Sequence, residues 1–191
     1  IAIIFQPELR KIFTRIGQGE WFRFSHSAQS LRLDAVVNAA EVLSGRRRGG
    51  LIVLGRQVGL KNYIDTGTIL DAEVSSSLIV TIFSHDTPLH DGAIIIEGGK
   101  MAAAGCFLPL SEQPDIRRSF GTRHRAALGL AEETDSVTVV VSEETGALSL
   151  AYEGNLLYDL TSKELSRRLK ALYSFSAEGD EESREEPSET E

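Results

Sequence analysis

Two glycine-containing turns, each between short apolar segments, restrict what this 191-residue chain can form. The apolar segments lie at 93–97 and 101–107 around Gly98-Gly99, and at 136–142 and 147–152 around Thr145-Gly146. Two short apolar segments joined by such a turn are typical of a β-hairpin, whose strands are antiparallel. We therefore expect several strands to be joined by hairpins rather than by helical crossovers.

The remaining apolar segments predict further strands and several helices. Residues 51–55 form a short continuous apolar run, which is typical of a strand buried on both faces, and 78–83 form another. Apolar residues that recur every three or four positions, with capping residues at the ends, predict the helices. These are expected at 6–17, 28–44, 123–134 and 161–173. The alternation favours a single α/β domain with a central mixed β-sheet flanked by helices.

The composition is that of an ordinary soluble globular protein. The chain is 41% hydrophobic and 25% charged, which allows a core that needs no metal or disulfide. The single cysteine, Cys106, excludes an internal disulfide framework and a cysteine-rich zinc module. No apolar run approaches the roughly 20 residues that cross a bilayer, and no signal-peptide pattern is present. Because the sequence starts at Ile1 without a methionine, we expect a fragment of a longer protein.

The net charge of −8 is concentrated at the carboxyl end. Residues 177–191 hold eight acidic residues and one arginine, which leaves a charge of only −1 on the rest of the chain. This acidic segment has no aromatic residues and is expected to be a disordered tail. The nearly neutral body argues against a protein built to bind nucleic acid through its phosphates. The basic run Arg46–Arg48 is expected to be a solvated turn.

The first candidate functional segment is Thr87–Ala93, which leads directly into a predicted strand. His90 and Asp91 place an imidazole and a carboxylate at the entrance of that strand, and Gly92 lets the backbone approach a ligand closely. These groups can bind a divalent cation, or Asp91 can accept a proton from a hydroxyl. The alternative is an ordinary turn, because Asp-Gly pairs are common in turns.

The second candidate segment is Gly121–Gly129, which opens a predicted helix. The free amides and the positive dipole end of this helix coincide with the hydroxyl and basic side chains of Thr122–Arg125. Amides, a hydroxyl and guanidinium groups together form an anion site of the kind that binds phosphate. Alternatively, these bases lie on the surface and pair with Glu132, Glu133 or Asp135.

A third candidate is the pair Ser142 and Glu143, which follows a predicted strand. Its hydroxyl and carboxylate can contact a ligand, and a polar hairpin turn is the alternative. The first two segments together indicate metal-assisted phosphate chemistry. Physical reasoning alone leaves the nucleotide and the reacting bond open.

The same segments resemble the signatures of diadenylate cyclase domains. His90-Asp91-Gly92-Ala93 is similar to the DGA signature of that family, and Gly121–Arg125 is similar to its RHR signature. Segments 102–111 and 134–146 also resemble the family. The resemblance covers roughly residues 25–173.

The resemblance extends to the amino-terminal segment Ile4–Arg10, which is similar to the region after the transmembrane helices in the membrane-bound branch. It implies a helix and linker at 1–24 after a missing membrane anchor, a catalytic domain with the diadenylate cyclase fold at 25–176, and the acidic tail at 177–191. The whole protein is then expected at the cell membrane with this domain on the cytoplasmic side, where regulatory protein partners can reach it.

The resemblance implies one reaction, the condensation of two ATP molecules into cyclic di-AMP with release of two pyrophosphates. Each 3′-hydroxyl attacks the α-phosphate of the other ATP, so two sites must face each other in a homodimer. The expected cofactor is Mg²⁺ or Mn²⁺. ATP is the expected substrate, and nucleic acid is not expected as a partner.

Individual residues take roles from the same resemblance. The expected catalytic residues are Asp91, Arg123, His124 and Arg125, and the expected metal ligands are His90 and Asp91. The expected nucleotide-binding residues are Gly92, Ala93, Phe107, Leu108, Thr122, Arg123, Ser142 and Glu143. Asp91 would orient or deprotonate the attacking hydroxyl, and the RHR residues would neutralise the triphosphate. Phe107 would pack on adenine, at a position where relatives often have tyrosine.

Two alternative functions would use the same residues. A catalytically silent sensor of adenine nucleotides would keep the pocket without turnover, although both signatures are intact here. A metal-dependent phosphohydrolase would need more carboxylates beside the metal than Asp91 alone supplies.

Overall fold

A single mixed β-sheet organises the chain. The computed structural model describes residues 20–113 and 120–182, and the side chains of 32–113 and 120–173. The strands are β1 (Gly50–Leu54), β2 (Thr68–Glu73), β3 (Ala93–Glu97), β4 (Lys100–Cys106), β5 (Val137–Val141), β6 (Leu148–Tyr152) and β7 (Asn155–Leu160). They lie in the order β2-β4-β3-β1-β5-β6-β7. Among these strands, β1 and β3 are parallel and all other neighbours are antiparallel, which confirms the predicted mixed sheet and both hairpins.

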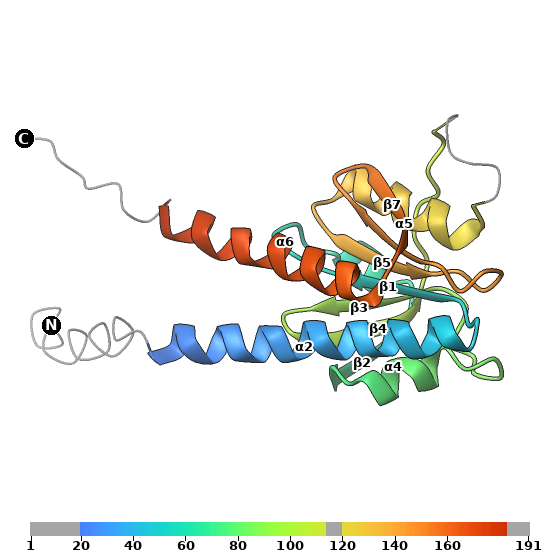
Figure 1. The fold of residues 1–191 in the computed structure, drawn as a ribbon, viewed down its shortest axis with the longest axis horizontal. Coiled ribbons are helices and arrows are strands. Elements are labelled where there is room, and N and C mark those ends of the chain that lie inside the picture. The colour runs from blue at the N-terminus through green and yellow to red at the C-terminus, as the bar shows by residue number, and fades with distance from the viewer. Residues whose placement is uncertain (1–19, 114–119, 183–191) are drawn as a thin grey trace, which may run out of the picture. The chain divides into compact units, whose positions relative to one another are not determined.

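Helices cover both faces of this sheet (Figure 1). They are α2 (Glu20–Gly45), α3 (Lys61–Ile64), α4 (Ser76–Ile82), α5 (Thr122–Glu133) and α6 (Ser162–Glu182). On one face α2, α4 and α6 bury apolar side chains such as Leu43, Ile79 and Leu165. On the other face α5 buries Leu130, and Tyr63 of α3 packs beside it. Because β1 is buried on both faces, its sequence is apolar without alternation.

The chain divides into two units, Ile1–Leu31 and Arg32–Glu191. In the first unit the structure describes only the helical backbone from Glu20, so the helix predicted at 6–17 lies outside the described residues. The helix predicted at 28–44 is confirmed in the second unit, and α2 begins earlier than expected. The candidate site, and every side-chain contact given below for the described residues, belong to the second unit.

The carboxyl-terminal helix α6 extends beyond its predicted end at Tyr173. It continues to Glu182, so α6 includes residues 177–182 at the start of the predicted acidic tail. Extending an existing helix by one residue costs far less than nucleating a new one, which favours this continuation. The rest of the predicted tail lies outside the described residues.

The strand predicted at 78–83 is wrong, because these residues form most of α4. The Ser75 side chain caps the helix by accepting a hydrogen bond from the backbone N–H of Leu78 at 3.3 Å. Ile79 and Ile82 are buried at a spacing of three residues, which matches one face of a helix. A short run of β-branched residues does not by itself distinguish a strand from a buried helix.

The two edge strands, β2 and β7, were not predicted. Each is largely exposed or only partly buried, and each contains an aspartate with positive φ, Asp71 and Asp159. The pairing register of each strand also shifts at an irregularity. Acidic residues in the middle of a short segment are typical of turns, so the local sequence does not indicate these strands.

Strand direction brings distant segments to one edge of the sheet. Because β1 and β3 are parallel, Asp91 and Gly92, which precede β3, lie beside the start of β1. β4 and β5 run antiparallel to β3 and β1, so their carboxyl ends, Cys106 and Val141, lie at the same edge. A short connection at the opposite edge joins α5 to β5, and the amino end of α5 therefore also lies here.

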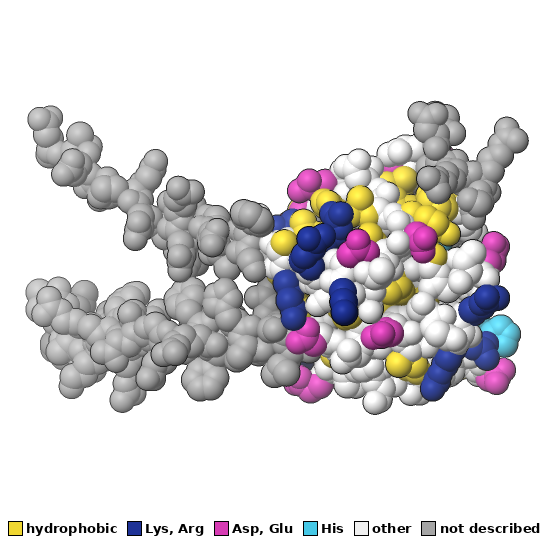
Figure 2. Space-filling view, in the orientation of Figure 1, with side chains coloured by type: hydrophobic (Ala, Val, Ile, Leu, Met, Phe, Trp, Pro, Cys, Tyr) yellow, Lys and Arg dark blue, Asp and Glu magenta, His cyan; other side chains and the backbone are white. Residues whose placement is uncertain are grey.

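Charged side chains of both signs occupy the face of the molecule seen in Figure 2. Lysine and arginine side chains of the described residues lie among carboxylates, with hydrophobic side chains between them. A continuous basic track, which would follow a phosphate backbone, is not seen among the described residues of this face.

Candidate functional site

A cavity of about 400 Å³ opens at this edge of the sheet. It is lined by Leu51, Asp91, Gly92, Cys106, Phe107, Leu108, Leu110, Thr122, Arg123, Ala126 and Glu143. The lining therefore combines an apolar wall with a carboxylate, a hydroxyl and a guanidinium group. This volume is within the usual range for small-molecule sites.

The turn before β3 forms one side of the cavity. Gly92 has a φ of +117°, and a Cβ there would lie 2.7 Å from the carbonyl carbon of Gly105 and 2.8 Å from the carbonyl oxygen of Cys106. Only glycine fits this backbone, since an added methyl group would overlap the main chain of β4. The close approach leaves Asp91 exposed at the cavity edge.

Replacement of Gly92 by alanine is expected to destabilise the fold by about 2 kcal/mol or more, because it combines an unfavourable φ with backbone overlap. Thermal unfolding should show a Tm lower by about 4–8 °C. Gly45→Ala is the control, since a Cβ at Gly45 meets nothing within 4 Å. Equal Tm values for the two variants would contradict the proposed steric role of Gly92.

The amino terminus of α5 forms the opposite side. Its N-cap is Gly121, which provides no side-chain hydrogen bond, and the first turn contains no acidic residue. The first amides of a helix have no partner within the helix and carry the positive end of its dipole. Thr122 and Arg123 add a hydroxyl and a guanidinium group to the cavity at this point. The arrangement suits an anion, as the sequence predicted.

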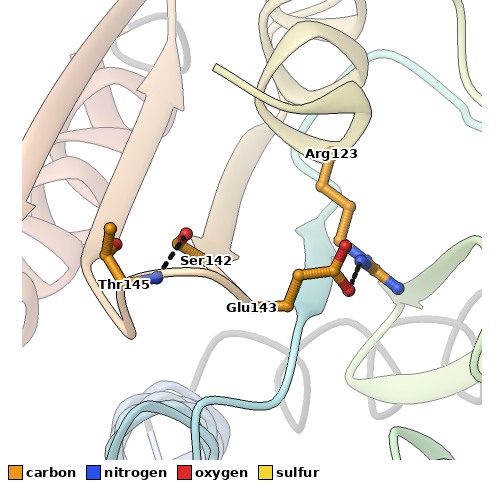
Figure 3. A network of polar contacts seen from close by, with 4 residues as sticks. All are labelled: Arg123, Ser142, Glu143 and Thr145. Atoms are coloured by element: carbon orange, nitrogen blue, oxygen red, sulfur yellow. Dashed lines mark hydrogen bonds and ion pairs between the residues drawn. The ribbon is translucent and has the colours of Figure 1, made fainter. Parts of the chain in front are cut away.

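Arg123 is held by an ion pair with Glu143, which comes from the turn between β5 and β6. Figure 3 shows the two side chains pointing toward one another. The distance from Arg123 Nη1 to Glu143 Oε2 is 2.5 Å. The Ser142 hydroxyl accepts a hydrogen bond from the Thr145 N–H and stabilises this turn. The Ser44 hydroxyl donates to the carbonyl of Gly146 at 2.6 Å and ties the turn to α2.

The alternative in which these bases pair with Glu132, Glu133 or Asp135 is not supported. Each of these carboxylates accepts hydrogen bonds from groups other than the predicted bases. Their donors are Ser111 and Gln113 for Glu132, Tyr63 for Glu133, and the backbone N–H groups of Gln57 and Val58 for Asp135.

The apolar wall comes from the loop after β4 and from the sheet beneath it. Phe107 is 68% exposed and Leu110 is 50% exposed, and both line the cavity, so their apolar surface is open to a ligand. Leu51, Leu110 and Ala126 also line the cavity but were not predicted. Leu110 could have been predicted from the apolar composition of residues 107–110. Leu51 and Ala126 could not, because in the sequence they look like ordinary core residues.

Sequence comparison assigns the domain. The family described as "DAC: DisA bacterial checkpoint controller nucleotide-binding" matches residues 37–156. The chain belongs to this family. It is 46% identical over 177 residues to cyclic di-AMP synthase CdaA of Bacillus subtilis and 44% identical over 183 residues to the diadenylate cyclase of Listeria monocytogenes. These alignments cover 91% and 93% of this chain but only 65% and 67% of the relatives, so the chain spans about two thirds of their length.

Solved structures of related proteins share the fold. A double mutant of DacA from Staphylococcus aureus matches with a TM-score of 0.73 at 43% identity, over 74% of this chain and 95% of that one. A structure described as a hypothetical membrane spanning protein from Bacillus cereus matches with a TM-score of 0.66 at 32% identity, over 84% and 80%. Within the described residues of the present DAC domain, no helix is both long and apolar enough to cross a membrane.

The RHR residues of the DAC domain separate in space. Arg123 lines the cavity, whereas the His124 side chain is 5% exposed and stacks on Phe120 with ring centroids 4.9 Å apart. Burial lowers the pKa of His124, which favours a neutral ring. The Arg125 side chain donates hydrogen bonds to the carbonyl of Ser111 at 3.1 and 3.3 Å. His124 and Arg125 therefore do not line the cavity in this structure.

Two other predicted contacts also lie behind the cavity lining. Ala93 is fully buried in β3, and Ser142 serves the turn that carries Glu143. Cys106 lines the cavity floor, where burial raises the pKa of its thiol to about 11 and keeps it protonated. The Cys106 side chain is also packed in the core cluster beneath α5 and is fully buried.

The predicted metal ligands are neighbours in the chain, but only Asp91 lines the cavity, and His90 is not among its lining residues. His90 Nδ1 lies 2.5 Å from the carbonyl oxygen of Thr87, and donation from Nδ1 to this carbonyl would leave Nε2 as the nitrogen available to a cation. Within the described residues, no three His, Cys, Asp or Glu side chains form a metal site. A magnesium-type cation commonly uses one or two carboxylates together with substrate phosphates. The residues present fit a cation of that kind, shared with a bound nucleotide.

Proposed function

We propose that this domain is a diadenylate cyclase that condenses two ATP molecules into cyclic di-AMP and releases two pyrophosphates. The observation that carries the proposal is the meeting of Asp91 with the cationic amino end of α5 in one cavity. Membership of the DAC family and the names of its relatives support the same activity.

The cavity offers a separate place for each part of ATP. Thr122, Arg123 and the free amides of α5 would bind the triphosphate, and Phe107 with Leu108 would contact the base. A guanidinium group and helix amides fixed at this position would also stabilise the charge that develops as pyrophosphate leaves.

Asp91 would act on the attacking hydroxyl. The 3′-oxygen of one ATP bonds to the α-phosphorus of the other, and the bond from that phosphorus to the oxygen bridging the α- and β-phosphates breaks. The hydroxyl proton passes to the Asp91 carboxylate, and pyrophosphate leaves with the bridging oxygen. The 3′-hydroxyl of the second ATP then attacks the α-phosphate of the first in the same way, which closes the ring and releases the second pyrophosphate.

A divalent cation would complete the site. Asp91 and His90 would hold Mg²⁺ or Mn²⁺ together with phosphate oxygens, and the ion would supply charge neutralisation on the triphosphate. Either ion is compatible with one carboxylate and one imidazole.

The reaction needs a second copy of the domain, because each cavity holds one ATP and the attacking hydroxyl belongs to another. Asp91 and Phe107 are exposed at the cavity edge, which leaves the reacting groups accessible to a partner that faces this edge. A two-fold homodimer would bring the two cavities face to face, so that each 3′-hydroxyl could reach the α-phosphate in the other cavity. In the whole protein, a membrane anchor would hold the domain at the cytoplasmic side, and the likeness to a protein described as membrane spanning supports this location.

Incubation of the protein with ATP and either Mg²⁺ or Mn²⁺ tests the proposal. We expect cyclic di-AMP and pyrophosphate, identified by chromatography and mass, and a rate per protein that rises with protein concentration where the dimer is only partly formed. ATP binding without product under either metal would indicate a sensor. Production of ADP and phosphate would indicate a hydrolase and would contradict the proposal.

A further inference from the structure

The loop after β4, residues 107–113, supplies three side chains to the cavity but has no regular secondary structure. The N–H of Phe107 donates to the Thr66 hydroxyl at 3.0 Å and ties down the start of the loop. A loop without strand or helix hydrogen bonds keeps one conformation only if other groups hold it. The position of the apolar wall therefore depends on what anchors the loop further along.

Ser111 is that anchor. It is 1% exposed, and its backbone and side chain bind one helix, α5. Its N–H donates to the carbonyl of Arg125 at 3.0 Å, and its own carbonyl accepts from the Arg125 guanidinium. Its hydroxyl donates to Glu132 Oε1 at 2.6 Å. A buried loop residue with all of its polar groups paired to one helix is fixed relative to that helix.

The surface of α5 is shaped to accept the loop. Gly129 lies between Arg125 and Glu132, and a Cβ on it would overlap the carbonyl oxygen of Pro109 and lie 2.8 Å from the Ser111 nitrogen. The spacing of 125, 129 and 132 defines one face of the helix. Thr122, Arg123 and Ala126 occupy a neighbouring face, which lines the cavity. One helix thus contacts the loop with one face and provides the anion site with another.

We propose that Ser111, Arg125 and Glu132, here called the Ser111 cluster, are positioning residues for the base-binding wall. The cluster sets Phe107, Leu108 and Leu110 at a fixed distance from the phosphate-binding end of α5, and so determines affinity for the nucleoside half of ATP. The inference rests on the proposed function, which places a base against this wall. It gives Arg125 a role in the loop rather than on the triphosphate.

Binding of two probes to the Ser111→Ala protein tests this role. The first probe, 3′-deoxy-ATP, contains base and triphosphate but lacks the reacting hydroxyl, and the second is inorganic tripolyphosphate with Mg²⁺. We expect the Kd of 3′-deoxy-ATP to rise about tenfold, because the ligand must then order a loop that this hydrogen bond to a charged group had held, a bond worth roughly 1.5 kcal/mol. The Kd of tripolyphosphate should stay unchanged. In turnover, KM for ATP should rise while kcat stays within about twofold.

Further variants separate positioning from general destabilisation. Ser111→Thr keeps the hydroxyl and should restore binding, and Glu132→Ala should repeat the pattern of Ser111→Ala. Glu133→Ala is the matched control, because Glu133 is also on α5 and accepts a 2.6 Å hydrogen bond, but its donor is Tyr63 of α3 rather than a residue of the loop. Its affinity for both probes should equal that of the unmodified protein.

The results distinguish this inference from the proposed function. Unchanged binding of 3′-deoxy-ATP to Ser111→Ala and Glu132→Ala, or an equal loss for both probes, would overturn the role of the cluster. A protein that makes no cyclic di-AMP but loses 3′-deoxy-ATP affinity selectively in Ser111→Ala would refute the activity and support the cluster.

Discussion

Replacement of Asp91 by asparagine is expected to reduce cyclic di-AMP formation by roughly 10²- to 10⁴-fold, the range that a general base contributes. Asparagine has nearly the same size and can still accept a hydrogen bond from the 3′-hydroxyl, but it does not take up the proton. Asp91 is exposed at the cavity edge, so the substitution leaves the core unchanged. ATP affinity should fall only modestly, because Arg123 and the amides of α5 still bind the triphosphate.

Product assays and ATP binding on the same preparation check this result. Asp86→Asn is a suitable control, since Asp86 is an exposed aspartate five residues before Asp91 that does not line the cavity. It should retain full activity. Turnover by Asp91→Asn at the unmodified rate would remove Asp91 from the role of base, whereas loss of ATP binding together with turnover would assign it to binding.

Local sequence signals predicted the central part of the fold correctly. The central strands β1, β3, β4, β5 and β6 are apolar because both faces of the sheet are covered, and glycine turns mark the hairpins. The edge strands lack this signal, since half of their side chains meet solvent. The mistake at α4 has a related cause, because a short buried helix and a short buried strand have similar apolar content.

For the candidate site, the sequence indicated which segments line the cavity better than it indicated which side chains face it. Successive residues of a helix point about 100° apart, so two residues separated by two positions point in nearly opposite directions. Arg123 and Arg125 therefore lie on different faces of α5, although one signature contains both. Ser111 gave no functional signal, since its importance depends on contacts with Arg125 and Glu132 that only the fold creates. Asp91 and Gly92 were predictable because a glycine with an adjacent carboxylate is a local feature.

Replacement of Arg123 by alanine is expected to weaken ATP binding by roughly 10- to 100-fold, since hydrogen bonds from a guanidinium to phosphate are among the stronger contacts in proteins. The Kd should also depend less on salt, because one charged contact is lost. Titrations of ATP at two ionic strengths measure both effects. Arg167→Ala, which removes an exposed arginine of α6 outside the cavity, should keep the affinity and salt dependence of the unmodified protein.

The ion pair between Arg123 and Glu143 allows a second variant to separate the lost phosphate contact from charge repulsion. In the Arg123→Ala protein the Glu143 carboxylate loses its partner beside the phosphate site, so part of the lost affinity comes from repulsion rather than from the missing contact. The double variant Arg123→Ala with Glu143→Gln should therefore bind ATP more tightly than Arg123→Ala alone. Binding weaker than in the single variant would mean that Glu143 itself supports the nucleotide, through the metal or a hydroxyl. Unchanged affinity in Arg123→Ala would show that the triphosphate does not lie at the amino end of α5.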